Sequence, residues 1–351
     1  MKKQSSAYFK EYNLLANSLL KLPVVEGCDH LRDLKNGFIM SLAFKHKSTE
    51  YLEVTALGRA FPSIIAKEFE GKTNERVVKS TVYPVLMAPY ISDESAKLCE
   101  KLRISYMDMS GNCMLSFGSL YVSDQGHPNK FARKRVAKSI FNPSSSVSSQ
   151  ILRLLMQDIS KPWKLSQLSE ELKCSIGQVS KVKDYLCEQL WAQMTTNGLI
   201  ILDPQAIMRV WSEVYSEKST LFDMLDCYSL LPIPEFEKTV QTIRLAKGVD
   251  CYLTGFSGGV RYTPVVRYTK VHVMIRERDL QEFLNVAPCK PVESGANVQI
   301  HILSTDEFFH DSRIIDDQLV VSPVQVYLDC MRQKGRGEEM AEAVFRKEVM
   351  K

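Results

Sequence analysis

The chain has 351 residues, of which 45% are hydrophobic and 25% charged, so it has the composition of an ordinary globular protein with room for two or three domains. A net charge of +4 permits a nucleic-acid partner without requiring one. No apolar run is long enough to span a membrane, and the start MKKQSSAYFK lacks the apolar core of a signal peptide, so we expect no membrane partner.

The cysteines and histidines give little support for a disulfide framework or a metal site. The nine cysteines are odd in number and form no CxxC pair, and the six histidines show neither HxxxH nor HExxH spacing. Scattered cysteines in apolar stretches are typical of buried free thiols in a reducing compartment. We therefore expect a cytoplasmic protein with no metal and no cofactor.

Residues 1–135 are expected to form an α/β domain. Short apolar, β-branched runs predict strands, and Ser92 followed by acidic residues predicts the start of a helix. The predicted order is strands at 38–46 and 51–58, a helix at 59–70, a buried strand at 81–91, a helix at 92–102, a strand at 104–109 and a hairpin at 111–123.

This order resembles the core of restriction endonucleases, whose metal site needs a carboxylate on one strand and Glu-x-Lys on the next. Here the second position reads Glu53-Val54-Thr55, so the lysine is missing, and the preceding predicted strand has no acid. The sequence thus predicts a degenerate, inactive nuclease-like domain in which Glu53 is the one candidate catalytic residue. Asp108, followed by Gly111-Asn112, is expected to shape a turn rather than bind metal.

A basic linker follows this domain. It contains Lys130, Arg133, Lys134, Arg135 and Lys138 without an acidic residue, and it ends in the turn-forming sequence Asn-Pro-Ser-Ser-Ser. Two interpretations remain open for this run: a solvated surface at a domain edge, or contact with the phosphates of DNA.

Residues 136–215 carry the order of a winged helix-turn-helix. Helices are predicted at 148–157 and 166–173, and a third at 176–191 has Ser175 as its N-cap. Asn197-Gly198 between two short apolar runs then predicts a hairpin, which would be the wing.

A helical wheel of the third helix separates a core face from a polar face. Val179, Val182, Leu186 and Leu190 share one narrow arc and are expected to pack inward. The N-terminal half of the opposite side would enter the major groove, with Gln178 reaching an adenine edge and Lys181 a guanine or phosphate. The predicted DNA-binding residues are Ser175, Gln178, Ser180 and Lys181, together with Lys130, Arg133, Lys134 and Arg135 of the linker.

Residues 216–351 are expected to form a mixed α/β domain. The sequence LTGFSGG followed by a strand is similar to the start of a nucleotidyltransferase site, but the strand carries Lys270, His272 and Met274 where paired acids would hold Mg²⁺. Catalysis is therefore not expected, and tight helix–strand packing explains the glycines.

The last two predicted helices combine apolar and basic residues. Val326, Met331, Met340 and Val344 lie near Arg332, Lys334 and Arg336 in the sequence, a pattern suited to a protein interface. The alternative is that these helices only cap the domain core. We assign Arg332, Lys334 and Arg336 as candidate partner-binding residues.

Three stretches of the chain resemble AbiEi-like antitoxins of type IV toxin–antitoxin systems. They are PWKLSQLSEELKCSIGQVSKVKDYLCEQLW with LDPQAIMRVWSEVY, VLMAPYISDESAKLCEKLRISYMDMSGNC, and VSPVQVYLDCMRQKGRGEEMAEAVFRK. The resemblance implies a transcriptional autoregulator paired with a nucleotidyltransferase-like toxin. The expected function is therefore DNA-binding regulation; a Mg²⁺-dependent nuclease with a substrate-delivering winged helix, and a winged-helix adaptor that docks proteins, remain as alternatives.

Overall fold

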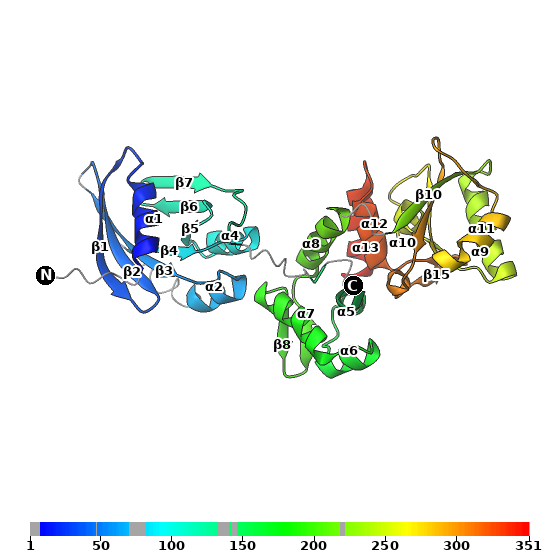
Figure 1. The fold of residues 1–351 in the computed structure, drawn as a ribbon, viewed down its shortest axis with the longest axis horizontal. Helices are drawn as coiled ribbons and strands as arrows, with labels where there is room; N and C mark the ends of the chain where they lie inside the picture. Colours follow the sequence, from blue (N-terminus) through cyan, green and yellow to red (C-terminus); the bar gives the residue numbers. More distant parts are fainter. Residues whose placement is uncertain are drawn as a thin grey trace. The chain divides into compact units, whose positions relative to one another are not determined.

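The computed structural model describes residues 8–46, 48–69, 82–131, 140–141, 146–217 and 222–350 (Figure 1). It is a mixed α/β protein, as the sequence predicts. The chain forms two compact units: the first comprises Met1–Ala137 and Glu188–Leu190, and the second comprises Lys138–Cys187 and Trp191–Lys351. The predicted boundary at 135/136 lies close to this division, whereas the one at 215/216 lies inside the second unit.

The first unit is built on a sheet of seven described strands in the order β1-β2-β3-β4-β5-β6-β7. The strands at both ends pair antiparallel, while β3, β4 and β5 are parallel and are connected through helices. The elements are α1 (Phe9–Leu19), β1 (Val25–Leu34), β2 (Gly37–Phe44), β3 (Thr49–Ala56), α2 (Pro62–Phe69), β4 (Val82–Ala88), α4 (Asp93–Lys101), β5 (Ser105–Asp108), β6 (Cys113–Phe117) and β7 (Leu120–Asp124).

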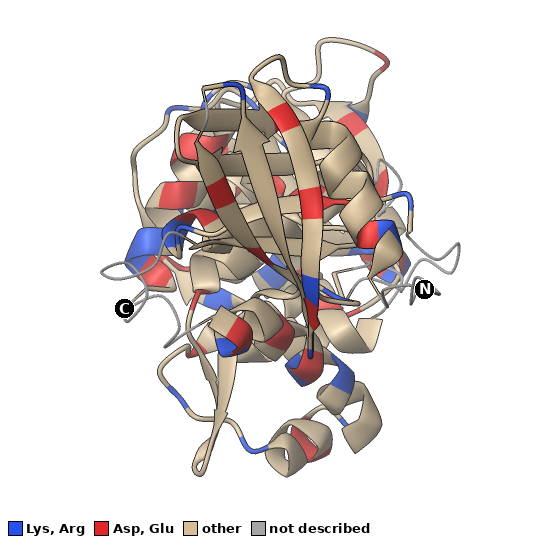
Figure 2. Ribbon diagram, turned by 90° about the vertical axis from the view of Figure 1, so that its left-hand side faces the viewer, with Lys and Arg blue, Asp and Glu red and all other residues tan. Residues whose placement is uncertain are grey.

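Two elements of the first unit, α1 and β1, were not predicted from the sequence. Helix α1 buries only Leu15, Ala16 and Leu19, which is too short an apolar stripe to stand out. Strand β1 carries residues of both charges along its length (Figure 2), and most of its side chains are exposed or half-buried. It lies at the edge of the sheet and forms backbone hydrogen bonds with β2. Pairing with β2, rather than burial of its own side chains, therefore makes this segment a strand.

The second unit begins with three helices and a hairpin, here called the helix–hairpin segment (residues 146–201). The hairpin also pairs with Trp163, two residues before α6: the Trp163 N–H donates to the Leu199 carbonyl at 2.9 Å, and the Leu199 N–H donates to the Trp163 carbonyl at 2.8 Å. The segment consists of α5 (Ser146–Gln157), α6 (Leu165–Glu171), α7 (Ile176–Glu188), β8 (Ala192–Thr195) and β9 (Gly198–Ile201), in the predicted order.

The rest of the second unit surrounds a sheet of seven described strands in the order β13-β10-β14-β12-β11-β16-β15. Strand pairs β12–β14 and β11–β16 are parallel and the others antiparallel. The elements are β10 (Asp223–Tyr228), α9 (Ile233–Lys247), β11 (Cys251–Leu253), α10 (Gly255–Tyr262), β12 (Val271–Arg276), η1 (Glu277–Asp279), α11 (Leu280–Val286), β13 (Lys290–Pro291), β14 (Val298–Leu303), η2 (Glu307–Phe309), β15 (Arg313–Ile315), β16 (Gln318–Val320), α12 (Pro323–Met331) and α13 (Gly337–Glu348).

The helix–hairpin segment and this sheet share one hydrophobic core. Helix α8 (Pro204–Glu217) joins them: its Ile207, Met208 and Trp211 are buried, and it packs against α12. One cluster of buried side chains in mutual contact has members from Ile140 to Val349, in both the helix–hairpin segment and the sheet. The predicted boundary at 215/216 therefore cuts through a helix, because the apolar stripe of α8 serves both parts of the unit.

None of the described helices is long and apolar enough to cross a membrane. All nine cysteines are free, and six of them are buried, which agrees with their positions in apolar stretches.

Candidate nucleic-acid interface

Helix α7 begins with a reciprocal cap. The Ser175 backbone N–H and hydroxyl both donate to Oε1 of Gln178 at 3.0 Å, and the Gln178 N–H donates to the Ser175 hydroxyl oxygen at 3.3 Å. Ser175 is thus the N-cap, as predicted, and Gln178 completes a capping box. The amide oxygen of Gln178 is occupied by the cap, which leaves its exposed Nε2 as the group that can reach outward.

The inward face of α7 is largely as predicted. Val179, Val182 and Leu186 are buried. Leu190 is not: the helix ends at Glu188, and Leu190 has a φ of 61° and a relative exposure of 38%. The wheel fails at Leu190 because the chain has left the helical conformation there.

The outward face of α7 presents one lysine without a partner. Lys181 is exposed, and no ion pair within the described parts of the chain involves it, whereas Lys183 is half-buried and pairs with Asp184. Ser180 is half-buried on the same helix. Lys181 is therefore the cation of α7 that is available to a ligand.

The hairpin turn lies one residue earlier than predicted. Thr195 pairs with Gly198, so Thr196 and Asn197 form the turn and Gly198 starts β9. Gly198 has a φ of 140°, and a side chain there would lie 2.7 Å from the backbone of Trp163. Close approach of the Trp163 backbone explains this glycine, while Gln193, Thr196 and Asn197 remain exposed at the hairpin.

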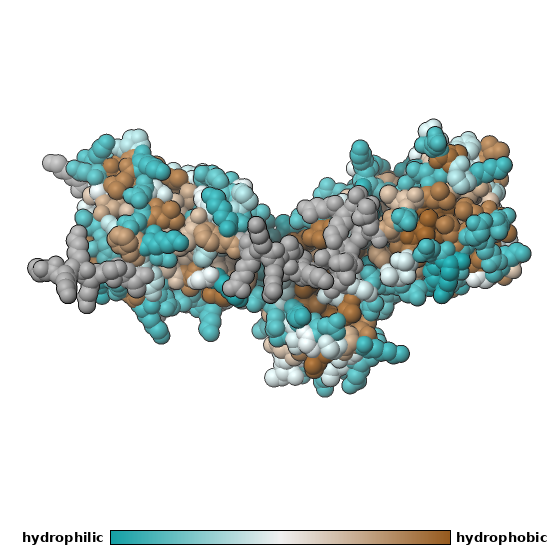
Figure 3. All heavy atoms as spheres, in the orientation of Figure 1, coloured by the Kyte–Doolittle hydropathy of each residue, from teal (hydrophilic) through white to brown (hydrophobic). Residues whose placement is uncertain are grey.

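Apolar residues accompany these polar ones on the surface of the segment. Ile176, the first residue of α7, is 56% exposed, and Met194 is about half-exposed, as is Leu202 directly after the segment. Hydrophobic atoms appear between hydrophilic ones on the face of the segment visible in Figure 3. Sequence patterns missed Ile176 as a surface residue; the signal that could have shown it is its place in the first turn, next to Gly177 and Gln178, which are also exposed.

The charge of the segment is less favourable to DNA than its composition indicates. Arg153, one of six basic residues in the segment, is only 2% exposed. Lys130 is exposed, and its backbone N–H donates to the Ser110 hydroxyl at 3.3 Å. Arg133, Lys134, Arg135 and Lys138 lie outside the described residues.

Glu53, the candidate nuclease residue of the first unit, does not belong to a cluster of metal-binding side chains among the described residues. Glu53 is half-buried on β3 opposite Ile39 of β2, and within the described residues no three His, Cys, Asp or Glu side chains meet as a metal cluster. Asp108 is buried and shapes a turn, as predicted: its Oδ1 accepts from the N–H groups of Ser110, Gly111 and Asn112 at 2.8–2.9 Å, and its Oδ2 accepts from Ile91 and the Asn112 amide.

The apolar part of the predicted partner surface is wrong. Val326, Met340 and Val344 are fully buried, because α12 and α13 pack against each other and against α10. The basic residues differ among themselves: Arg332 is half-buried against the rings of Tyr215 and Phe222, while Lys334 and Arg336 are exposed.

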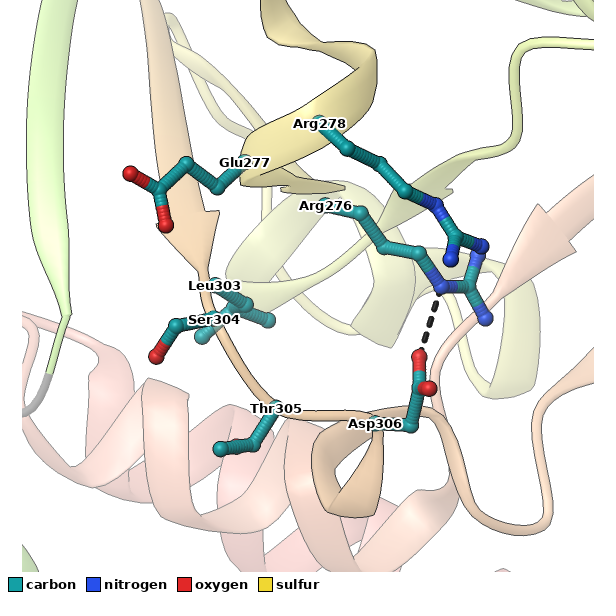
Figure 4. Close-up of a pocket in the computed structure, with 7 residues that line it drawn as sticks. All are labelled: Arg276, Glu277, Arg278, Leu303, Ser304, Thr305 and Asp306. Carbon is teal, nitrogen blue, oxygen red and sulfur yellow. Dashed lines mark hydrogen bonds and ion pairs between the residues drawn. The ribbon is translucent and has the colours of Figure 1, made fainter.

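A hollow in the second unit lies at the carboxyl ends of β12 and β14 (Figure 4). Its volume is about 310 Å³, and Arg276 points across it to Asp306, with Nε 2.6 Å from the carboxylate. The guanidinium also stacks on Phe309 at 4.5 Å from the ring centre. These contacts occupy Arg276, and the other arginine of the hollow, Arg278, is exposed and pairs with Asp279 at 3.7 Å.

No family model, no curated protein and no solved structure matches the chain.

Proposed function

We propose that the helix–hairpin segment is a winged helix that binds double-stranded DNA and that the protein is a transcriptional regulator. The observation that carries the proposal is the start of α7, where a capped helix presents Ile176, the amide nitrogen of Gln178 and the unpaired Lys181 to solvent. A helix enters the major groove by such an end, and an amide, a lysine and an apolar side chain can contact an adenine, a guanine or phosphate, and a thymine methyl group.

Lys181→Ala should weaken binding to a selected DNA site by about 1–3 kcal/mol, on the order of 5- to 150-fold in Kd. DNA is selected from a random library, and Kd is measured by fluorescence anisotropy. Lys183→Ala is the matched control, since it removes the same charge from the same helix at an ion-paired position, and it should stay within about twofold of wild type. Equal affinities of the Lys181→Ala and wild-type proteins would remove α7 from the interface.

A second variant tests whether Gln178 contacts a base in addition to capping α7. Gln178→Glu keeps an Oε acceptor for Ser175 and so preserves the capping box, but it removes the amide donor. Its stability should match that of wild type while its preference for the selected site falls.

The antitoxin role rests on the family resemblance, and within it we propose that the exposed basic residues after α12 contact a nucleotidyltransferase-like toxin. A chain truncated near Tyr215 cannot test this, because α12 covers α8 in the shared core. Charge reversal is the suitable change.

Lys334→Glu with Arg336→Glu should abolish growth rescue in cells that express the neighbouring toxin gene. Lys247→Glu, an exposed lysine at the end of α9, is the control and should rescue fully. Full rescue by the double variant would place toxin contact elsewhere.

Protein docking is a second candidate function for the helix–hairpin segment. It is favoured by the exposed Ile176 and Met194 and by the burial of Arg153, which leaves five cations and five acids outside the core of the segment and so no net positive charge. Failure of the wild-type protein to enrich any DNA site would favour this candidate.

A further inference from the structure

An open cleft in the second unit lies outside the proposed DNA-binding surface. It has a volume of about 770 Å³, within the range of small-molecule sites. It lies beside the starts of the parallel strands β12 and β14, where Lys270, His272 and Gln299 line it, and beside the first turn of α10, which contributes Phe256. The short segment between α12 and α13 completes the wall.

The charge of the cleft is positive. Lysine or arginine stands at four lining positions, Arg267, Lys270, Lys334 and Arg336, and none of the described residues that line it is acidic. Lys270 is paired with Asp226 at 3.1 Å, and Arg336 with Glu339. Arg267 and Lys334 are exposed and have no ion pair within the described residues. Two uncompensated cations thus face one hollow, which suits a ligand with at least two negative charges.

One lining residue, His272, carries a hydrogen-bond donor that no other described residue uses. Nδ1 of His272 lies 3.4 Å from Nε2 of His301, and both rings are buried. Nδ1 of His301 has no partner in the part of the chain that the structure describes. When Nε2 of His301 donates to Nδ1 of His272, Nδ1 of His301 carries no proton and is a buried acceptor without a donor. The reverse direction would place the proton on Nδ1 of His301 and bury an unpaired N–H, which costs more free energy. Nε2 of His272 then carries its proton, and His272 lines the cleft.

The first turn of α10 adds backbone donors. Its N-cap is Thr254, whose hydroxyl donates to the buried Asp329 instead of capping the helix. Among the described residues, no side chain accepts a hydrogen bond from the N–H groups of Gly255, Phe256 and Ser257, and this turn contributes Phe256 to the cleft. A helix N-terminus beside two free cations is an environment that favours a phosphate group.

We propose that this cleft binds a nucleoside triphosphate, with Arg267 and Lys334 contacting the phosphates and the rings of Phe256 and Tyr268 contacting the base. Tyr268 is held in place by its hydroxyl, which donates to Glu237 at 2.6 Å. The proposal goes beyond DNA binding and assigns no transfer reaction, because His272 and Met274 occupy the strand positions where a metal-binding carboxylate pair would be needed.

Titration calorimetry with ATP on the full-length protein tests the site. ATP should bind, tripolyphosphate should compete with it, and adenosine should not bind, because the cations recognise phosphate. The double variant Arg267→Ala/Lys334→Ala should weaken ATP binding at least tenfold. Arg278→Ala is the control: it removes an arginine that is 73% exposed from the other hollow, and it should bind ATP like wild type.

Several outcomes would overturn the proposal: no ATP binding by the wild-type protein, equal weakening by Arg278→Ala, or binding of adenosine as tight as that of ATP. Loss of affinity for a selected DNA duplex in the double variant, with ATP binding unchanged, would instead make the cleft part of a nucleic-acid surface. Lys181→Ala should leave ATP binding unchanged, so failure of the DNA-binding proposal and failure of this one can be told apart.

Discussion

Lowering the pH from 7.5 to 5 should destabilise the second unit by about 4 kcal/mol through His272 and His301, roughly 2 kcal/mol for each. Burial lowers the pKa of His272 to about 3, with the neighbouring His301 adding to the effect, and burial likewise lowers the pKa of His301 to about 3. The unfolded chain binds these protons near pH 6.5, so the stabilisation is complete above that pH and is lost as the pH falls towards 3.

Urea unfolding followed by tryptophan fluorescence measures this loss. The three tryptophans, Trp163, Trp191 and Trp211, all belong to the second unit, so their emission reports on that unit alone. Burial raises the pKa of Asp329, which has the opposite sign: its contribution grows as the pH falls. A His301→Gln variant isolates one histidine, and its stability should fall about 2 kcal/mol less than that of wild type. Parallel pH profiles of the two proteins would contradict the prediction.

Arg153→Ala should lower the free energy of unfolding of the second unit by about 3–5 kcal/mol. The guanidinium lies in the shared core between the rings of Trp211 and Phe308, each 5.4 Å away, and it donates to Gln325 at 2.6 Å. Gln325 in turn donates to Tyr215 at 2.8 Å, and Tyr215 donates to Asp329 at 2.9 Å. Truncation removes the packing of a long side chain and leaves the amide oxygen of Gln325 buried without its donor.

The same fluorescence assay measures this effect, and Trp211 lies directly beside the change. Arg153→Met separates packing from charge, since it restores most of the volume without the hydrogen bond, and it should be less destabilising than alanine. Arg278→Ala provides the exposed control and should change stability by less than about 0.5 kcal/mol. A loss below about 1 kcal/mol for Arg153→Ala would show that the network adds little to the junction of α5, α8 and α12.

Local sequence patterns predicted the structure correctly where residues close together in the chain decide it. Ser175 and Gln178 define the start of α7 by capping, and Val179, Val182 and Leu186 define its buried face by spacing. Asp108 with Gly111 and Asn112 forms the predicted turn because short-range hydrogen bonds decide it. In the C-terminal part, the strand that follows LTGFSGG (β12) and the last two helices (α12 and α13) were predicted for the same reason.

What the sequence by itself determined is therefore the mixed α/β class, the order of helices and hairpin in residues 146–201, and the polar start of α7. Only the tertiary structure decided that Arg153 is buried, that Val326, Met340 and Val344 belong to the core, and that the boundary at 215/216 is crossed by one helix. It also brought Arg267, His272 and Lys334 to one cleft. The physical reason is that burial and ion pairing depend on partners distant in the chain, which spacing and composition do not specify.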